Sequence, residues 1–421
     1  MLDLKFIREN VELVRKGAEA KGIAINLDEL ISLDEQRRKL IQEGESLKAK
    51  RNEVSAQIGK LKKEGGDASR AIAEMVSVKD RIQAIDLELR DVEKKVNELL
   101  LTIPNVPHPS VPLGRTPAEN KEVFRWGDFP AVDFELKPHW ELVEKLGIID
   151  FARGAKVMGA GFPFYVGKGA TLERALINFF LEQAIQRGYK EIAPPLVVNE
   201  DSARGTGQIP DKEDLMYVVE RDQLYMIPTA EVPVTNFHRD ELLTEKDLPI
   251  RYAAYTPCFR REAGSYGKDV RGLNRIHQFD KVELVKFVHP STSYDELESL
   301  RQDAEHLLQL LGLPYRTLLM CTGDMGFTQT KKYDLEVWAP GQQKWLEVSS
   351  CSDFEAFQAR RMNLRFRPAN GTKPEFVHTL NGSGLALPRV VAALIEHYQT
   401  PEGKVIIPKA LHPYTRFELI G

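Results

Sequence analysis

The sequence is poor in cysteine and in long apolar segments. Its cysteines are Cys258, Cys321 and Cys351, and they form no Cys-x-x-Cys or Cys/His pattern. We therefore expect three free thiols, no zinc and a reducing compartment. No apolar stretch approaches the ~18 residues that a membrane helix needs, and residues 1–10 lack the apolar core of a signal peptide. The sequence predicts a cytoplasmic protein with no membrane association.

The common nucleotide and hydrolase motifs are also missing. There is no G-x-x-x-x-G-K-[ST] loop, and the nearest G-x-G-x-x-G match, at Gly159 and Gly161, has Phe164 in place of the third glycine. No G-x-S-x-G sequence surrounds the serines near Ser349, and no histidine lies in a metal-ligand pattern. The net charge of -4 excludes a protein that coats nucleic acid everywhere, so any such contact needs a local basic surface.

Residues 1–100 are predicted to be helical, with a long hairpin of two helices over about 27–100. Apolar residues of the second helix follow spacings of 3 and 4, typical of a coiled coil, at Met75, Val78, Ile82, Ile85, Leu89, Val92, Val96 and Leu99. The first helix repeats an apolar residue every seven positions from Leu33 to Leu61, and the glycines of Glu64–Ser69 predict the turn. Helices of ~35 residues would make an antiparallel arm roughly 50 Å long.

The outer half of the first helix is basic. Between residues 48 and 63 there is one acid, Glu53, and there are six basic residues: Lys48, Lys50, Arg51, Lys60, Lys62 and Lys63. A solvated coiled-coil surface explains this pattern, and so does a finger that contacts an RNA backbone. The second interpretation depends on the rest of the chain having a use for RNA.

Leu101–Pro117 contains five prolines and no periodicity, which predicts a stiff linker and a domain boundary. In residues 118–421, short alternating segments mix with helical ones without a βαβ rhythm. We therefore expect an α+β domain built on an antiparallel β-sheet flanked by helices.

The stretch Cys258–Val285 is predicted to be a strongly charged β-hairpin. Alternate residues of a strand share a face, which groups Arg260 with Glu262 on the first strand and, on the second, Arg275, His277, Phe279, Lys281 and Glu283. A polar face toward water is the simpler interpretation. However, a phenylalanine among charges suits the stacking of an aromatic base, and arginine binds phosphate oxygens through two parallel hydrogen bonds.

Three motifs resemble those of the class II aminoacyl-tRNA synthetases. Phe259–Glu262 followed by Arg275-x-x-x-Phe279 resembles motif 2, and Gly188–Pro195 after a helix predicted over Leu172–Arg187 resembles motif 1 of the dimer interface. Gly382–Arg389 resembles motif 3, although Pro388 replaces the acidic residue that many members carry before the arginine. Over the whole chain the sequence resembles the seryl-tRNA synthetase family, through Thr229–Glu231, residues 258–265 and 277–283, Glu347–Ser350 and Thr379–Ser383.

The resemblance implies ATP-dependent attachment of serine to tRNA(Ser) through seryl adenylate, and to tRNA(Sec) where it exists. Arg260 and Arg389 are the implied catalytic residues, with Arg260 at the α-phosphate and the serine carboxylate. Arg275 and Arg389 would meet the outer phosphates, and Phe279 would stack on adenine with Arg389 on the other side. The implied ATP site is Arg260, Arg261, Glu262, Arg275, Ile276, Phe279, Glu347, Val348, Ser349, Ser350 and Arg389.

The resemblance also implies a magnesium site and a serine site. Glu347 and Ser350 would bind Mg²⁺, but their odd spacing requires a β-bulge or a strand end to bring them to one face. Glu347 paired with an arginine is the alternative. Glu283 would bind the serine ammonium, in a serine site of Thr229, Ala230, Glu231, Arg260, Glu283, Asn381 and Ser383. A structural ion pair for Glu283 and a tight turn at Ser383 are the simpler alternatives.

The helical arm would bind the long variable arm of tRNA(Ser) whose end enters the active site of the other subunit, which implies a homodimer. Lys268 and Arg271, in the loop Ala263–Leu273, would meet the tRNA acceptor end. Two alternatives stay open. One is a class II paralogue that charges another amino acid or a carrier protein, and the other is a non-catalytic RNA-binding coiled-coil protein.

Overall fold

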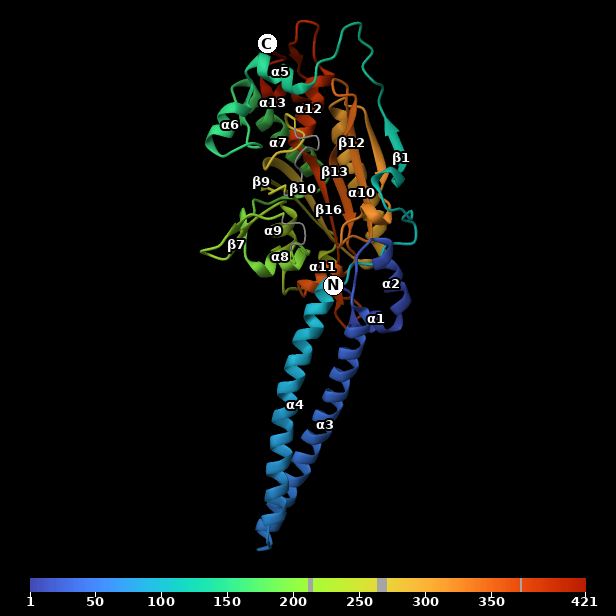
Figure 1. Cartoon of the computed structure of the whole chain (residues 1–421), viewed down its shortest axis with the longest axis vertical. Coiled ribbons are helices and arrows are strands. Elements are labelled where there is room, and N and C mark those ends of the chain that lie inside the picture. The colour runs from blue at the N-terminus through green and yellow to red at the C-terminus, as the bar shows by residue number, and fades with distance from the viewer. Residues whose placement is uncertain (211–214, 263–270, 372) are drawn as a thin grey trace. The chain divides into compact units, whose positions relative to one another are not determined.

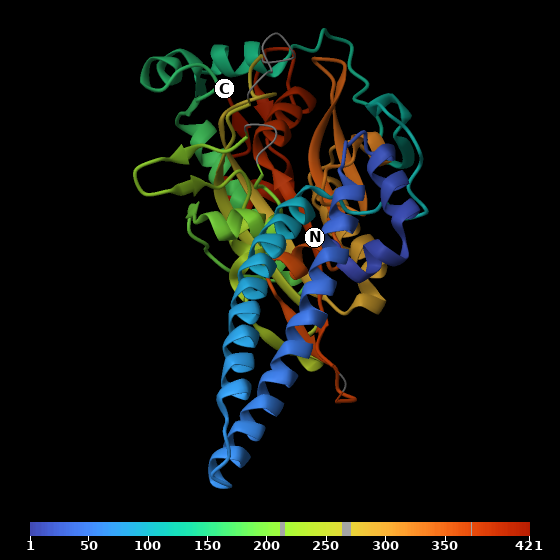
Figure 2. The same ribbon diagram turned by 60° about the horizontal axis from the view of Figure 1, so that its bottom comes forward.

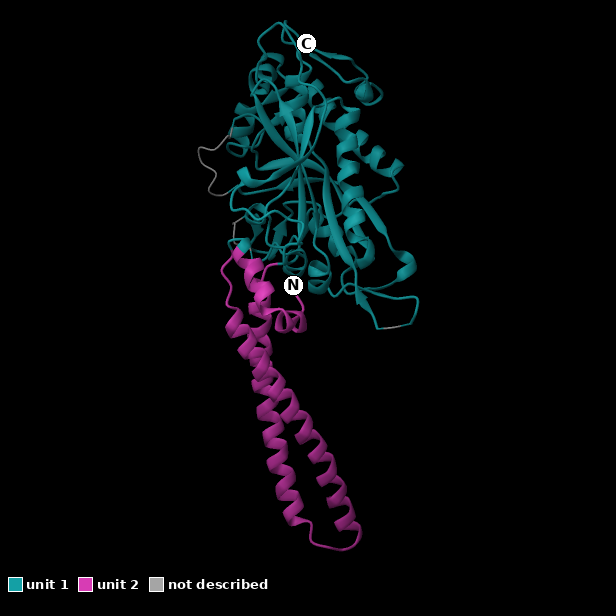
Figure 3. Ribbon diagram, turned by 90° about the vertical axis from the view of Figure 1, so that its right-hand side faces the viewer, with its two compact units in different colours: residues 1, 20–22, 105–421 teal, residues 2–19, 23–104 magenta. Residues whose placement is uncertain are grey.

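The computed structural model describes residues 1–210, 215–262, 271–371 and 373–421. The chain forms two compact units, shown in two colours in Figure 3. The smaller unit contains Leu2–Glu19 and Ile23–Pro104, and the larger contains Met1, Ala20–Gly22 and Asn105–Gly421. Every strand that the described residues form lies in the larger unit.

The smaller unit is helical, with α1 (Leu4–Glu9), α2 (Val11–Ala20), α3 (Leu27–Lys63) and α4 (Ser69–Thr102). Helices α3 and α4 run antiparallel and side by side, as Figures 1 and 2 both show. Helix α3 begins after Asn26, whose side chain accepts a hydrogen bond from the backbone N–H of Glu29. Its last turn carries Lys60, Lys62 and Lys63. Their positive charges interact favourably with the negative end of the helix dipole. The predicted coiled-coil hairpin is confirmed.

The seam between α3 and α4 follows the predicted heptads. The buried residues of α4 include Val78, Ile82, Ile85, Val92 and Val96. On α3, Gly44 lies at this seam: it is buried, and a Cβ at Gly44 would lie 3.6 Å from the side chain of Ile85.

Asp34 is a buried acid of α3 that the apolar pattern did not predict. Its carboxylate lies 2.8 Å from Arg8, 3.6 Å from Arg37 and 3.3 Å from Arg38. Three cations therefore offset the cost of burying this charge.

The larger unit is built on a sheet of eight strands in the order β1-β11-β12-β13-β16-β10-β9-β4. Neighbouring strands are antiparallel except for β4 and β9, which are parallel. The strands are β1 (Lys121–Trp126), β4 (Lys190–Glu191), β9 (Ile250–Phe259), β10 (Gln278–Val288), β11 (Tyr315–Leu319), β12 (Lys331–Ala339), β13 (Lys344–Asp353) and β16 (His378–Ala386). This confirms the predicted α+β class.

The other elements of the larger unit flank this sheet (Figure 1). Its α-helices are α5 (His139–Leu146), α6 (Phe151–Val157), α7 (Lys168–Gln186), α8 (Glu200–Thr206), α9 (Glu231–Thr235), α10 (Ser293–Leu310), α11 (Phe357–Arg361), α12 (Leu387–His397) and α13 (His412–Thr415). The short strands are β2 (Ile149–Asp150), β3 (Phe164–Tyr165), β5 (Val197–Val198), β6 (Val218–Val219), β7 (Leu224–Met226), β8 (Leu242–Thr244), β14 (Arg365–Arg367), β15 (Glu375–Phe376), β17 (Val405–Ile406) and β18 (Leu419–Ile420). Single 3-10 turns are η1 (Pro117–Glu119), η2 (Asn236–His238), η3 (Glu245–Asp247), η4 (Pro290–Thr292), η5 (Thr322–Asp324) and η6 (Lys409–Leu411).

The two faces of the sheet have different roles. Helices α7, α10 and α12 pack on one face through the main hydrophobic core, to which β10 contributes Val282 and Leu284. On the other face, Val285 and Phe287 of β10 enter a second core with α9 and α11. Lys281 and Glu283 share that second face, where they line a pocket.

Candidate active site

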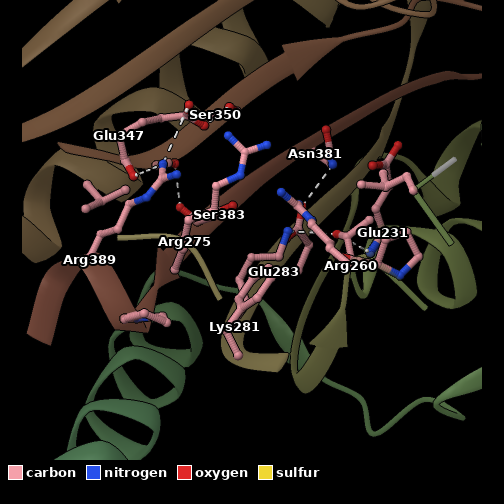
Figure 4. Close-up of a pocket in the computed structure, with 18 of the residues that line it drawn as sticks. Glu231, Arg260, Arg275, Lys281, Glu283, Glu347, Ser350, Asn381, Ser383 and Arg389 are labelled. Atoms are coloured by element: carbon pink, nitrogen blue, oxygen red, sulfur yellow. Dashed lines mark hydrogen bonds and ion pairs between the residues drawn. The ribbon is translucent and has the colours of Figure 1, made fainter. Parts of the chain in front are cut away.

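The pocket on the second face of the sheet brings together most of the predicted site (Figure 4). The predicted ATP and serine residues that line it are Thr229, Glu231, Arg260, Glu262, Arg275, Ile276, Phe279, Glu283, Glu347, Val348, Ser349, Ser350, Asn381, Ser383 and Arg389. Two predicted residues do not line it. Ala230 is fully buried in the second core, and Arg261 is exposed beside the strand end, where its backbone N–H bonds to the carbonyl of Leu215.

The predicted hairpin is shorter than expected. Strand β9 ends at Phe259, so Arg260 and Glu262 lie beyond it, and Glu262 has a φ of 50° in the left-handed region. Strand β10 begins at Gln278, so Arg275 precedes it. The prediction that these residues stand on regular strands is wrong, although their side chains still reach one pocket. The reason is that the chain turns away after the last paired residues.

At one end of the pocket, Glu283 is held by two neighbours on the sheet. Its carboxylate forms an ion pair with Lys281 and accepts a hydrogen bond of 2.9 Å from Asn381 Nδ2. Lys281 Nζ also donates to Thr229 Oγ1 at 2.8 Å. Both the ion-pair alternative and a role in binding an ammonium are therefore compatible with the position of Glu283.

Glu231 is a second buried carboxyl at this end, at the start of α9. Its Oε1 accepts a hydrogen bond of 2.7 Å from Gln358 Nε2 of α11. Burial, and after it the negative charge of Glu283, raises the pKa of Glu231 to about 7. This end of the pocket therefore contains a carboxyl that holds its proton more tightly than an ordinary glutamate does.

Three arginines occupy the rest of the pocket wall. Figure 4 shows Arg275 and Arg389 on the side of Glu347, and Arg260 on the side of Glu231. Arg260 Nε donates to the carbonyl of Pro228 at 3.2 Å, and its guanidinium lies 5.1 Å from the centre of the Phe279 ring. Arg260 is thus the arginine that lies over the Phe279 ring, and the expected position of Arg389 across the adenine stays a prediction.

The other two arginines pair with nearby oxygens. Arg275 forms an ion pair with Glu262. Arg389 lies in the first turn of α12, and it donates to the carbonyls of Asn274 at 3.1 Å and Glu347 at 2.9 Å. The positive end of the helix dipole adds to the charge of Arg389 there.

A β-bulge brings Glu347 and Ser350 together, as their odd spacing required. Leu335 of β12 pairs with Ser349 while the next residue, Glu336, pairs with Glu347, so Val348 is the extra residue. Ser350 Oγ lies 3.1 Å from Glu347 Oε1 and 2.7 Å from Asp334 Oδ1.

The charge at Glu347 suits a cation. Desolvation by the pocket walls alone would raise the pKa of Glu347, but Lys332 and then Arg389 outweigh it and hold the pKa below the ordinary value. Glu347 Oε2 also lies 3.9 Å from Arg389 Nη1, so the alternative ion pair is present as well. An ionised carboxylate beside a hydroxyl is a donor set that fits Mg²⁺, which binds few protein oxygens and keeps its waters.

Two known domain families match the chain. The seryl-tRNA synthetase N-terminal domain matches residues 1–107, and the class II core domain of tRNA synthetases for G, H, P, S and T matches residues 217–398. A serine–tRNA ligase of Salinibacter ruber is 56% identical over 100% of this chain and 99% of its own length. The chain belongs to the seryl-tRNA synthetase family.

Two further matches agree with this assignment. A serine–tRNA ligase of Geobacter sulfurreducens is 55% identical over 98% of each chain. The crystal structure of seryl-tRNA synthetase from Pyrococcus horikoshii complexed with ATP has a TM-score of 0.94 and 38% identity, over 100% of this chain and 99% of that one. These matches support neither of the two alternative functions, nor the charging of tRNA(Sec).

Several residues that line the pocket or bond to its lining residues had no role in the sequence prediction. Strand parity placed Lys281 on the correct face, but nothing in the sequence indicated that it joins Glu283 to Thr229. Asp334 lies opposite Ser350 on the neighbouring strand, and a sequence pattern could have found it only with the strand pairing known. Gln358 comes from a separate helix and left no signal.

The predicted tRNA-binding residues differ in their exposure to solvent and in whether an acidic side chain lies beside them. Lys60, Lys62 and Lys63 are exposed, whereas Lys48 lies 3.5 Å from Asp86 and Lys50 lies 2.8 Å from Glu74. Arg51 is half-buried. In the larger unit, the guanidinium of Arg271 lies 5.3 Å from the ring of Trp140, and Lys268 lies outside the described residues. Within the described part of the chain, no helix has the length and apolar character to cross a membrane.

Proposed function

We propose that this chain activates serine with ATP to form seryl adenylate and then transfers the seryl group to tRNA(Ser). Serine–tRNA ligation is the activity of the family to which the chain belongs. The main structural support is a single pocket with Glu283 at one end and Arg275 and Arg389 at the other. An amino acid and a nucleoside triphosphate need this separation of charge when they bind next to each other.

In activation, a serine carboxylate oxygen attacks the α-phosphorus of ATP and pyrophosphate leaves. Arg260 neutralises the carboxylate and the α-phosphate, which otherwise repel each other. Arg275 and Arg389 hold the outer phosphates in line with the attack. The ring of Phe279 supports adenine. No protein nucleophile takes part, because positioning and charge neutralisation supply the rate in phosphoryl-type transfers.

Selection of serine is proposed at the opposite end. Glu283 binds the ammonium group, while Thr229, Glu231 and Ser383 face the hydroxyl. Polar groups arranged for a hydroxyl remain unpaired when alanine binds, which makes such a pocket discriminating.

Glu347 and Ser350 are proposed to hold Mg²⁺, which would supply positive charge to the phosphates. Within the described residues, no cluster of three or more His, Cys, Asp or Glu side chains offers a metal site. Glu347→Gln should raise the Mg²⁺ concentration that half-saturates ATP–pyrophosphate exchange. An unchanged Mg²⁺ dependence would contradict this role.

The arm is proposed to bind tRNA(Ser), with its exposed Lys60, Lys62 and Lys63 against the RNA backbone. A helical hairpin that contacts phosphates and ribose hydroxyls reads the shape of an RNA helix, which suits a long variable arm. We propose domains of residues 1–100 for the tRNA, a linker of 101–117, and 118–421 for catalysis. The end of α4 at Thr102, with the prolines after it, supports this division.

The functional unit is proposed to be a homodimer in the cytoplasm. Helix α7 and β4 carry the segment that resembles motif 1, and the exposed apolar side chains of Phe164, Val166 and Ile185 lie in or near it. Sedimentation should give twice the chain mass of 47.8 kDa, and a monomer would contradict the dimer. The three buried free cysteines support a reducing compartment.

A panel of amino acids in ATP–pyrophosphate exchange tests the proposed reaction. Serine should give the highest kcat/KM, and alanine and threonine should give far less. Stronger exchange with any other amino acid would refute the assignment of serine.

A further inference from the structure

A buried hydrogen-bond network outside the pocket converges on the carboxylate of Glu396. This residue, near the end of α12, is fully buried. Its Oε1 accepts from the backbone N–H of His139 at 2.8 Å, from His139 Nδ1 at 2.8 Å and from Gln342 Nε2 at 2.7 Å. Its Oε2 accepts from the backbone N–H groups of Gly341 at 3.0 Å and Gln342 at 3.1 Å. The carboxylate thus ties α5, α12 and the β12–β13 turn together.

The backbone N–H groups assign donors and acceptors in this network, in which Gln342 Nε2 also lies 3.1 Å from His139 Nδ1. The backbone N–H of Leu273 donates to His139 Nε2 at 2.9 Å, so Nε2 is an acceptor. The ring hydrogen of a neutral imidazole is then on Nδ1, which donates a hydrogen bond to Glu396 Oε1. In the same way, Gln342 donates its Nε2 to Glu396, which leaves its Oε1 to accept from Asn274 Nδ2 at 2.7 Å.

From Glu396 the network has two branches, one through His139 to Leu273 and one through Gln342 to Asn274. Both branches end directly before Arg275. Leu273, Asn274 and Arg275 all line the pocket. Gly272, just before them, has a φ of +65°, and a Cβ there would lie 2.2 Å from His139 Nε2, so the backbone passes directly against the imidazole. At the other side of the segment, Arg389 Nε donates to the carbonyl of Asn274 at 3.1 Å.

We propose that Glu396 and His139 are positioning residues for Arg275 and Arg389, and we call this pair with its two branches the Glu396 clamp. Glu396 and His139 do not line the pocket, so they act through residues 272–274. The proposal rests on the phosphate-binding roles proposed above for the two arginines. The clamp fixes the distance between them, because one arginine follows the clamped segment and the other bonds to it.

Glu396→Gln tests the clamp with almost no change in volume. The amide presents donors where the carboxylate only accepted, so at least two N–H groups of the network meet a donor instead of an acceptor. In ATP–pyrophosphate exchange, kcat/KM for ATP should fall about 10- to 100-fold, while KM for serine changes little.

Glu305→Gln is the matched control. Glu305 is also buried, accepts hydrogen bonds from Thr317 Oγ1 at 2.6 Å and from Arg301, and does not line the pocket. This control should lower the melting temperature without a selective effect on ATP. Gln342→Met is a second variant, which cuts the Asn274 branch at a half-buried position and keeps the His139 branch. It should give a smaller effect in the same direction.

Two results would overturn the clamp. One is a folded Glu396→Gln or Gln342→Met protein with unchanged kcat/KM for ATP, and the other is an equal loss for ATP and serine, which would indicate general loosening. Arg275→Ala and Arg389→Ala separate this proposal from the proposed function. If both arginine variants lose ATP affinity and the clamp variants do not, the clamp is wrong. If the arginine variants keep ATP affinity, the phosphate roles themselves are wrong, and the clamp is overturned with them.

Discussion

Replacement of Glu231 by glutamine should make the stability of the protein less dependent on pH. The pKa of this carboxyl rises from 4.5 to about 7, because of burial first and of Glu283 second. At ~1.4 kcal/mol for each tenfold change in proton affinity, this rise corresponds to at most roughly 3 kcal/mol. Glutamine keeps the hydrogen bond from Gln358 Nε2 but has no titratable proton. The difference between the variant and the wild-type protein therefore reports the ionisation of Glu231.

The direction of the pH effect on stability follows from the pH at which Glu231 loses its proton in the folded and in the unfolded protein. Below the unfolded value near 4.5, the carboxyl is protonated in both states and its contribution to stability is complete. Between there and pH 7 the unfolded chain releases the proton first, so the wild-type protein loses stability that the variant keeps. The melting temperature of Glu231→Gln minus that of wild type should grow over this interval and then level off, at about 4 °C or less.

Differential scanning fluorimetry from pH 4.5 to 8.5 measures this difference. Glu220→Gln is the control, because Glu220 is solvent-exposed and its replacement should give a difference that stays flat with pH. A difference for Glu231→Gln that is also flat, or that falls as the pH rises, would refute the reasoning. Such a result would mean that Glu231 is ionised at neutral pH despite its burial.

Two further predictions concern ATP and tRNA. Phe279→Ala should weaken ATP binding by ~1–3 kcal/mol through the loss of stacking, seen as a higher KM for ATP in exchange, and an unchanged KM would contradict the role of the ring. Deletion of residues 34–92 should leave adenylate formation nearly intact and abolish tRNA charging. The two helices are close together near the cut, where Arg37 Nε, inside the deleted stretch, lies 3.4 Å from Glu93 Oε1. Normal charging after this deletion would exclude the arm from tRNA recognition.

The arm could be predicted from the sequence because its information is local. The apolar spacing in residues 75–99 fixes which side of α4 is buried, and the glycines after Lys63 fix the turn. Asp34 could not be predicted in the same way. A buried acid breaks the pattern, and its partner Arg8 comes from a different helix, so only the folded structure shows the compensation.

Strand parity predicted the pocket face of β10 but not the ends of the hairpin. Phe279, Lys281 and Glu283 share a face because a regular strand alternates strictly. Arg260 lies past the end of β9, where alternation no longer applies, and charged residues do not mark this point in the sequence. The predicted site residues still line one pocket, because the residues after the end of β9 and those before the start of β10 both reach it.

The bulge at Val348 shows a different limit. The odd spacing of Glu347 and Ser350 required an irregularity if both were to bind one ion, and the structure contains it. The sequence alone did not give its position, because any residue between the two could have been the extra one. Pairings such as Glu231 with Gln358 lay further out of reach, since they join residues from separate helices with no shared pattern.

The ion pairs at the two ends of the pocket differ in strength, and this difference agrees with the ligand proposed for each end. At the proposed phosphate end, Arg389 pairs with Glu347 while their side chains are 35% and 46% exposed, and such pairs contribute at most about 1 kcal/mol. Under the proposed role, a phosphate replaces Glu347 as the partner of Arg389 at little cost. At the proposed serine end, Lys281 and Glu283 are 6% and 1% exposed, and breaking a buried pair costs about 3–5 kcal/mol. A rigid end suits the proposed discrimination between small amino acids that differ by one hydroxyl or methyl group. At the proposed phosphate end, the clamped backbone sets the positions of the two arginines, and only their exposed ion pairs exchange for phosphate.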